Sequence, residues 1–99
     1  MRIDRVGNGP FAEVVTIGTM VRVGNIDIDV SAEQQDGQAV LDICEKNGEM
    51  VIGTDGASEY VATIVIPGRR YDGEDPLPLD IGSVTITLWP FNEKSGEEQ

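Results

Sequence analysis

Two adjacent arginines and a tyrosine, Arg69, Arg70 and Tyr71, are the residues of this chain best suited to recognising a charged group. They are a concentrated group, because the whole sequence holds only seven Lys and Arg residues. A guanidinium binds a carboxylate or phosphate through two parallel hydrogen bonds, and an aromatic ring beside it offers a stacking surface. The three residues therefore predict a binding site. In the competing interpretation the arginines only neutralise nearby acids. This interpretation is favoured because adjacent residues of a strand point to opposite faces, so that only one of the two arginines could serve a single site.

A cluster of carboxylates follows the arginines and raises the alternative of a calcium site. Calcium takes about six to eight oxygen ligands, often from flexible loops. The spacing lacks the glycine and the closing bidentate glutamate of an EF-hand, so metal binding ranks well below the binding of a protein. The carboxylates of this alternative are Asp72, Glu74, Asp75 and Asp80.

Catalysis lacks its usual agents in this sequence. The chain has no histidine, and its single cysteine, Cys44, has no residue predicted beside it that could act as a base. Nucleophilic and general acid–base catalysis need such partners. The sequence thus predicts a protein that is not an enzyme and that uses no cofactor.

The net charge restricts the possible partners. The chain carries 18 Asp and Glu residues against 7 Lys and Arg residues, which gives −11 at neutral pH. This charge repels nucleic-acid phosphates and anionic membranes, so we expect a protein partner or self-association. The alternative function is an inhibitor that mimics nucleic acid and fills a basic groove. The carboxylates that would serve this mimicry include Asp27, Asp29, Glu33 and Asp42.

The cellular setting is inferred from the cysteine count and from the distribution of apolar residues. A lone Cys44 cannot form an internal disulfide, and the first residues lack the charged-then-apolar layout of a signal peptide. No apolar stretch approaches the ~20 residues that cross a bilayer. These features predict a cytoplasmic protein.

The arginines lie in the longest segment without a strand pattern, residues 67–82, where Pro76 and Pro78 stiffen the exit. Loops of this length in compact domains are usually functional or disordered. Residues 67–82 are therefore the predicted contact site of a non-catalytic binding or assembly module.

Three two-residue turn signals predict the strands that hold this loop. Gly24-Asn25, Asp36-Gly37 and Asn47-Gly48 each separate apolar runs, as the tips of β-hairpins do. A helix beginning near Ser31 is the alternative, and Gly37 interrupts it after little more than one turn. The resulting registers oppose Val23 to Ile26, Arg22 to Asp27, Val30 to Ile43, Glu45 to Met50, and Ile43 to Ile52.

These registers put one set of residues on a common apolar face, because alternate residues of a strand share a side. The face includes Val15, Ile17, Val21, Ile28, Ile43 and Ile52. Residues 60–66 and 83–89 also alternate and predict a second layer, with Tyr60, Ala62, Ile64 and Ile66 on one face. Residues 2–6 predict a short edge strand.

The predicted fold is all-β, with one domain over residues 1–91. It contains an antiparallel meander and is a β-sandwich or a small β-barrel of about six or seven strands. Residues 92–99 are polar and acidic, and we expect them to form a disordered tail.

Overall fold

The structure of the chain, a computed structural model, describes residues 1–47, 49–53 and 59–90. Strands dominate these residues, so the all-β class is confirmed. No helix in the described part has the length and apolar character needed to cross a bilayer. The elements are β1 (Arg2–Arg5), β2 (Val14–Ile17), β3 (Met20–Val23), β4 (Ile26–Asp29), α1 (Val30–Glu33), β5 (Ala39–Lys46), β6 (Glu49–Ile52), β7 (Glu59–Ile66), β8 (Tyr71–Asp72), β9 (Asp75–Pro76), the 3-10 helix η1 (Ile81–Ser83) and β10 (Thr85–Leu88).

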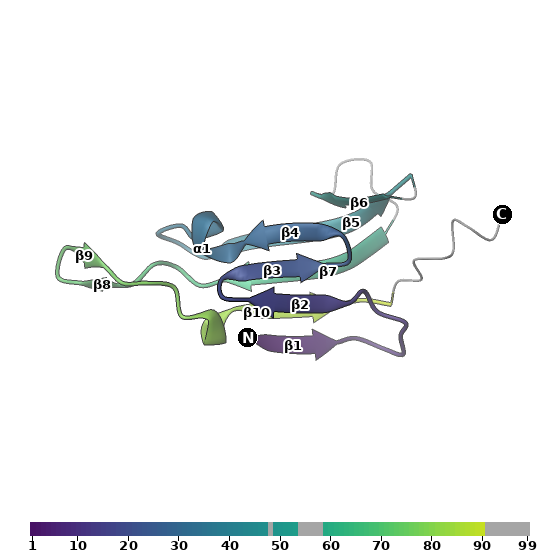
Figure 1. Cartoon of the computed structure of the whole chain (residues 1–99), viewed down its shortest axis with the longest axis horizontal. Coiled ribbons are helices and arrows are strands. Elements are labelled where there is room, and N and C mark those ends of the chain that lie inside the picture. Colours follow the sequence, from purple (N-terminus) through teal and green to yellow (C-terminus); the bar gives the residue numbers. More distant parts are fainter. Residues whose placement is uncertain (48, 54–58, 91–99) are drawn as a thin grey trace.

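The strands form three sheets (Figure 1). One sheet has the order β1-β10-β7-β5-β6, a second has the order β2-β3-β4, and β8 pairs with β9. All pairs are antiparallel except β1 with β10, which run parallel. The two larger sheets both end in edge strands, so the structure is not a closed barrel and that alternative is wrong. The predicted tail, residues 92–99, lies outside the described residues.

One hydrophobic core joins the two larger sheets, because each sheet has an apolar face that must leave water. Figure 1 shows the three-stranded sheet lying across the five-stranded sheet. Their facing residues belong to one buried cluster. The small sheet contributes Val21, Val23 and Ile28, and the large sheet contributes Ala39, Ile43, Ala62, Ile64, Ile66, Ile86 and Leu88.

Two of the three predicted hairpins are confirmed in register. Strand β3 pairs with β4 so that Val23 opposes Ile26 and Arg22 opposes Asp27. Strand β5 pairs with β6 so that Ile43 opposes Ile52 and Glu45 opposes Met50. Asn47 has a φ of +54°, the left-handed conformation that a type I′ turn requires. Gly48, the other predicted turn residue, lies outside the described residues.

The third hairpin, with Asp36-Gly37 at its tip, is wrong. The side chain of Asp29 accepts hydrogen bonds from the backbone N–H groups of Ser31 and Ala32 and so caps helix α1. The cap turns the chain out of the small sheet at Val30, which is fully buried. Strand β5 then pairs with β7 in the other sheet instead of with β4. The predicted four-stranded meander is therefore a three-stranded one.

The predicted direction of Val15 and Ile17 is also wrong. Ile17 opposes Met20 across a Gly18-Thr19 turn, which places Val15 and Ile17 on the outer face of the small sheet. Gly18 has a φ of +59°, so this tight turn depends on glycine. This turn was not among the three predicted turns, and one additional turn reverses the faces of a strand.

A β-bulge changes the side on which Tyr60 lies. Ile43 pairs with Ala62 and Cys44 pairs with Tyr60, so Val61 is an extra residue in strand β7. Val61 and Ala62 are both fully buried, whereas Tyr60 lies 48% exposed beside Trp89, with ring centroids 5.6 Å apart. The predicted face is confirmed for Ala62, Ile64 and Ile66 and wrong for Tyr60.

The opposed residues Ile43 and Ile52 provide a matched test of the core. Ile43 is fully buried as predicted, whereas the prediction that Ile52 belongs to the same buried face is wrong, because Ile52 lies on the edge strand β6 and is 53% exposed. We expect Ile43→Ala to lower the free energy of unfolding by about 2 to 5 kcal/mol, because it removes buried methylene groups and leaves a cavity. The same substitution at Ile52 should cost less than about 1 kcal/mol. Urea denaturation of both variants measures the difference, and equal losses would contradict this assignment of the core.

Candidate functional site

Residues 67–82 form an ordered arm instead of an irregular loop. Strands β8 and β9 pair within it, and the backbone N–H of Leu77 donates to the carbonyl of Arg70 at 2.8 Å, which extends the hairpin. Figure 1 shows this hairpin reaching away from the two larger sheets, on the side of helix α1. The arm thus carries the predicted binding residues on a regular backbone.

The three predicted binding residues do not act together. Arg69 and Tyr71 both bind Asp36, whereas Arg70 lines a separate pocket. This division follows from the extended backbone, on which alternate residues share a side. The structure therefore separates Arg69 and Tyr71, which share an acid, from Arg70, which lines the pocket.

Asp36 is the centre of the structural contact. Its Oδ1 atom accepts a hydrogen bond from Arg69 Nη1 at 3.0 Å and another from the Tyr71 hydroxyl at 2.5 Å. The second guanidinium nitrogen of Arg69 donates to the Gln34 carbonyl at 2.8 Å. In the competing interpretation the arginines neutralised acids of their own loop, but the acid that Arg69 binds lies 33 residues away in the chain.

Backbone contacts complete this clamp between residues 34–37 and 67–71. The N–H of Arg69 donates to the Gln35 carbonyl at 2.8 Å, and the Gln34 side chain donates to the Pro67 carbonyl at 3.2 Å. A Cβ atom on Gly68 would lie 2.6 Å from the Asp36 carbonyl oxygen, so only glycine allows the two segments to approach this closely. We name these contacts the arm clamp.

The arm clamp changes the acidity of Asp36. The hydrogen bond from Tyr71 holds the pKa of the Asp36 carboxyl below its ordinary value, and the Arg69 guanidinium adds to this effect against an opposing effect of desolvation. The carboxylate is thus fully charged at neutral pH and accepts both bonds.

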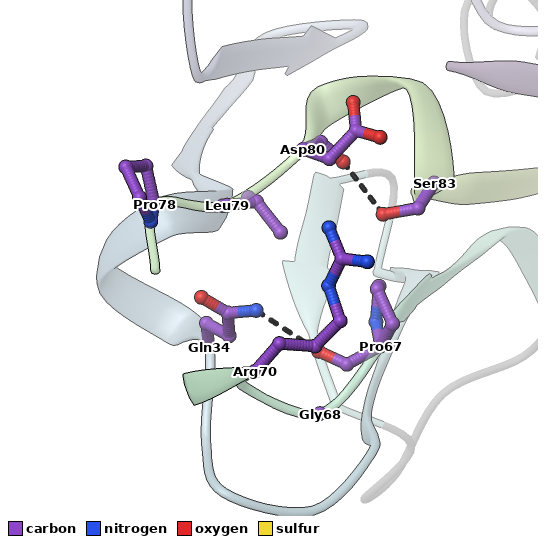
Figure 2. A pocket seen from close by; sticks show the side chains of 8 residues that line it. All are labelled: Gln34, Pro67, Gly68, Arg70, Pro78, Leu79, Asp80 and Ser83. Atoms are coloured by element: carbon purple, nitrogen blue, oxygen red, sulfur yellow. Dashed lines mark hydrogen bonds between the residues drawn. The ribbon is translucent and has the colours of Figure 1, made fainter. Parts of the chain in front are cut away.

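Arg70 lines a pocket of about 160 Å³ on the other side of the arm. Figure 2 shows its guanidinium pointing toward the turn that contains Asp80 and Ser83. Arg70 is exposed and forms no ion pair or side-chain hydrogen bond with any other described residue. The remaining wall is partly apolar and partly polar, formed by Pro67, Pro78, Leu79, Gln34, Asp80 and Ser83.

Helix η1 fixes the polar wall of this pocket. The Asp80 side chain accepts from the Gly82 N–H at 3.0 Å, and the Asp80 carbonyl accepts from the Ser83 hydroxyl at 2.6 Å. Leu79, which directly precedes this turn in the chain, packs against the core. The pocket therefore lies between two anchored segments, and its cation Arg70 has no side-chain partner in the described part of the chain.

The carboxylates proposed as calcium ligands lie in different parts of the arm and do not gather at one point. Asp72 and Asp75 oppose each other in the β8–β9 pair, and Asp80 caps helix η1. Across residues 1–47, 49–53 and 59–90 no three Asp, Glu, Cys or His side chains gather in a way that could hold a metal ion. The described structure gives no geometric support to a calcium site at Asp72, Glu74, Asp75 and Asp80.

The carboxylates of the nucleic-acid-mimic alternative do not form one row. Asp27 is in a bidentate ion pair with Arg22, with distances of 2.7 and 3.2 Å. Asp29 caps helix α1, while Asp42 lies in the other sheet and accepts from the Thr63 hydroxyl at 2.7 Å. A regular array of free charges is what such mimicry would need.

Cys44 is a buried structural residue. It opposes Val51 in strand β6 and Tyr60 in strand β7 and is only 1% exposed. Desolvation raises the pKa of its thiol, and the charge of Asp42 raises it further, so the thiol stays protonated at neutral pH. This environment disfavours a nucleophilic role.

The sequence indicated residues 67–82 as a distinct segment but did not indicate its partner, residues 34–37. Gln34 and Asp36 bind the arm, whereas the sequence had placed Asp36 at a hairpin tip. The available signal was indirect: a cation in a long loop can bind an acid, but nothing in the sequence indicated that Asp36 is the acid that binds Arg69. Comparison of the chain with family models, curated proteins and solved structures gives no match.

Arg69 and Arg70 are predicted to differ in their effect on stability, although substituting either by alanine changes the charge equally. Arg69→Ala removes two side-chain hydrogen bonds of the arm clamp and should lower the urea midpoint. Arg70→Ala removes no such bond and should leave the midpoint unchanged. Parallel urea denaturation measures both, and a larger loss for Arg70→Ala would contradict the division of roles.

Tyr71→Phe should raise the pKa of Asp36 toward its ordinary value, because it removes the hydrogen bond that lowers the pKa most. A lowered folded pKa stabilises the fold fully above the unfolded pKa of about 4, and this stabilisation is lost as the pH falls through the folded pKa. NMR titration of the Asp36 carboxyl carbon measures the shift. The control is Tyr60→Phe, whose hydroxyl has no described partner, and an unchanged Asp36 pKa in Tyr71→Phe would refute the clamp.

Proposed function

We propose that this protein is a non-catalytic binding module that contacts a protein partner through the arm of residues 67–82, with Arg70 at the centre of the contact. One observation carries the proposal: Arg70 has no side-chain partner among the described residues and lies beside a pocket, on an arm that five hydrogen bonds hold in place. Arginine is among the residues enriched at interface hot spots.

The anchoring of the arm supports this function energetically. Ordering a flexible loop on binding costs free energy, and a loop that is already ordered avoids most of that cost. The arm clamp and the Leu79 contact with the core supply this order. Tyr71 and Leu77, which are 47% and 37% exposed, add apolar contact area along the same arm.

The chemistry of the pocket favours a carboxylate of the partner as the group that binds Arg70. A guanidinium pairs with a carboxylate through two parallel hydrogen bonds, and the Gln34 amide lines the same space. Asp80 also lines the pocket, and its negative charge disfavours a doubly charged phosphate more than a singly charged carboxylate.

We also propose that the fold is a β-sandwich and that the protein is cytoplasmic. We describe the stacked larger sheets as a β-sandwich because they share one core cluster. The cytoplasmic setting rests on the single Cys44, which can form no internal disulfide.

Self-association is the alternative to a different protein partner. The mimic of nucleic acid and the calcium module rank lower, because their carboxylates are dispersed or occupied.

Arg70→Ala is predicted to weaken partner binding by about tenfold or more, that is by about 1.4 kcal/mol, without altering stability. The control is Arg5→Ala, which removes an equal charge from an exposed arginine of β1 that has no described ion pair. Quantitative recovery from cell extract with the wild type and both variants identifies the partner, and calorimetry with that purified partner gives the affinities.

Equal affinities of the wild type and Arg70→Ala would show that the arm is only a connector. Equal losses in both variants would show that net charge, and not the pocket, governs binding. Sedimentation of the protein alone separates self-association from binding to a different protein, because only self-association gives a dimer that Arg70→Ala dissociates.

A further inference from the structure

Strand β2 differs from the other edge strands of the two larger sheets. Proteins commonly protect edge strands from pairing with other chains by placing charged residues or proline on them. Among the four edge strands in the described part of the chain, only β2, with the sequence Val-Val-Thr-Ile, has neither. The charged residues of the other three are Arg2, Asp4 and Arg5 in β1, Asp27 and Asp29 in β4, and Glu49 in β6.

The backbone of β2 offers hydrogen-bonding groups on its free side. The Gly24 N–H donates to the Glu13 carbonyl at 2.9 Å, which makes these two residues a hydrogen-bonded pair of the β2–β3 ladder. In an antiparallel ladder hydrogen-bonded and non-hydrogen-bonded pairs alternate. Val14 and Thr16, opposite Val23 and Val21, therefore point their N–H and carbonyl groups away from β3.

No other described element covers this free side. Val15, Thr16 and Ile17 are all exposed, and Thr16 is exposed although its pair partner Val21 is fully buried. Strand β3 has no free side, because it pairs with β2 on one side and with β4 on the other. Figure 1 shows that β1, an edge strand of the large sheet, lies beyond β2, an edge strand of the small sheet. An additional strand beside β2 would therefore extend the small sheet toward β1.

An apolar depression adjoins the same edge. Val15, Ile17 and Met20 are 42%, 76% and 41% exposed and line a depression of about 410 Å³ on the outer face of the small sheet. Gly24, at a φ of +60°, also lines it and contributes no side chain to fill it. Single exposed apolar residues are common on protein surfaces, but a group of them indicates a contact surface.

The charges around the depression select the occupant. The one cation that lines it, Arg22, is already bound to Asp27 through two hydrogen bonds. Glu13 lines the depression and Asp29 opposes Met20, and neither forms an ion pair with a described cation. With a net charge of −11 on the chain, this surface favours a cationic partner. A second copy would instead bring like charges together.

We propose that the edge of β2 binds, by strand addition, an extended segment of a partner protein in which lysines or arginines flank a short apolar run. The backbone of the segment pairs with the outward groups of Val14 and Thr16. Alternate apolar side chains of the segment lie beside Val15 and Ile17, and its cations approach Glu13. This mode of recognition takes affinity from main-chain hydrogen bonds and specificity from alternate side chains.

This surface is a second site, distinct from Arg70 on the arm. The two sites select opposite charges, since Arg70 selects a carboxylate and the β2 edge selects cations. The two sites have no lining residue in common. A result against the proposed site on β2 therefore does not decide the proposed function of the arm, and the reverse is also true.

Three synthetic peptides with blocked ends test the proposal: KKVTVTVKK, its acidic counterpart EEVTVTVEE, and the strand-breaking control KKVTPTVKK. At a saturating concentration we expect the first peptide to slow hydrogen exchange of the Val14 and Thr16 amides by about tenfold or more, because pairing covers their N–H groups. The other two peptides should leave the exchange rates unchanged. NMR measures each amide separately.

Two variants test the geometry. Thr16→Pro removes an outward N–H that β3 does not use, so it should abolish peptide binding while the β2–β3 pairing remains. Ile17→Lys places a positive charge in the depression and should weaken binding of the cationic peptide by about tenfold. If Thr16→Pro fails to fold, Ile17→Lys still decides, because a residue that is 76% exposed tolerates the change.

Three results would overturn the proposal. The first is unchanged exchange at Val14 and Thr16 with the cationic peptide. The second is equal protection by the acidic peptide, which would remove the charge argument. The third is a dimer of the protein alone in about 0.15 M salt that Thr16→Pro dissociates, because a second copy would then be the occupant of the edge.

Discussion

The side chain of Asp29 determines how the rest of the chain is divided between the two larger sheets. It accepts hydrogen bonds from the N–H groups of Ser31 and Ala32 and from the Thr19 hydroxyl, so the chain leaves strand β4 as one turn of helix. Val30, the first residue of that turn, is buried in the core. Because the strand ends there, β5 is free to pair with β7, and the small sheet remains three strands wide.

Both candidate binding surfaces follow from this one turn. The segment after helix α1 passes beside the arm, where Gln34 and Asp36 bind it, and the arm in turn presents Arg70. The small sheet, limited to three strands, keeps β2 as an edge. A strand that continued through Val30 into β5 would have placed Asp36 in a tight hairpin, away from the arginines.

Local rules predicted the local parts of this fold. The β3–β4 and β5–β6 hairpins depend on two-residue turns and on alternation within a few residues, and both registers are correct. The pairing of β5 with β7 depends on residues far apart in the sequence, and no turn signal reports it. The bulge at Val61 adds one residue to a strand, which is enough to reverse the expected direction of Tyr60.

The candidate site shows the same limit. Composition and loop length singled out Arg69, Arg70 and Tyr71, and their role in binding stays a prediction. Alternation along a strand indicated that the two arginines face different ways, and the structure has Arg69 on Asp36 and Arg70 at the pocket. The sequence did not predict that Asp36 binds two of the three residues, because this contact spans more than thirty residues of chain. Nor did the sequence predict the exposed edge of β2, since the Gly18-Thr19 turn that orients the strand was not recognised.

The pairing of β10 between β1 and β7 has a consequence for the order in which the protein assembles. The ribosome produces β1 first and β10 last of the described strands, yet β10 is the strand that joins β1 to the sheet. Throughout most of synthesis, β1 therefore has no neighbour, and one side of β7 remains open. Contacts that join distant parts of a chain form slowly, so the large sheet is completed only after β10 leaves the ribosome.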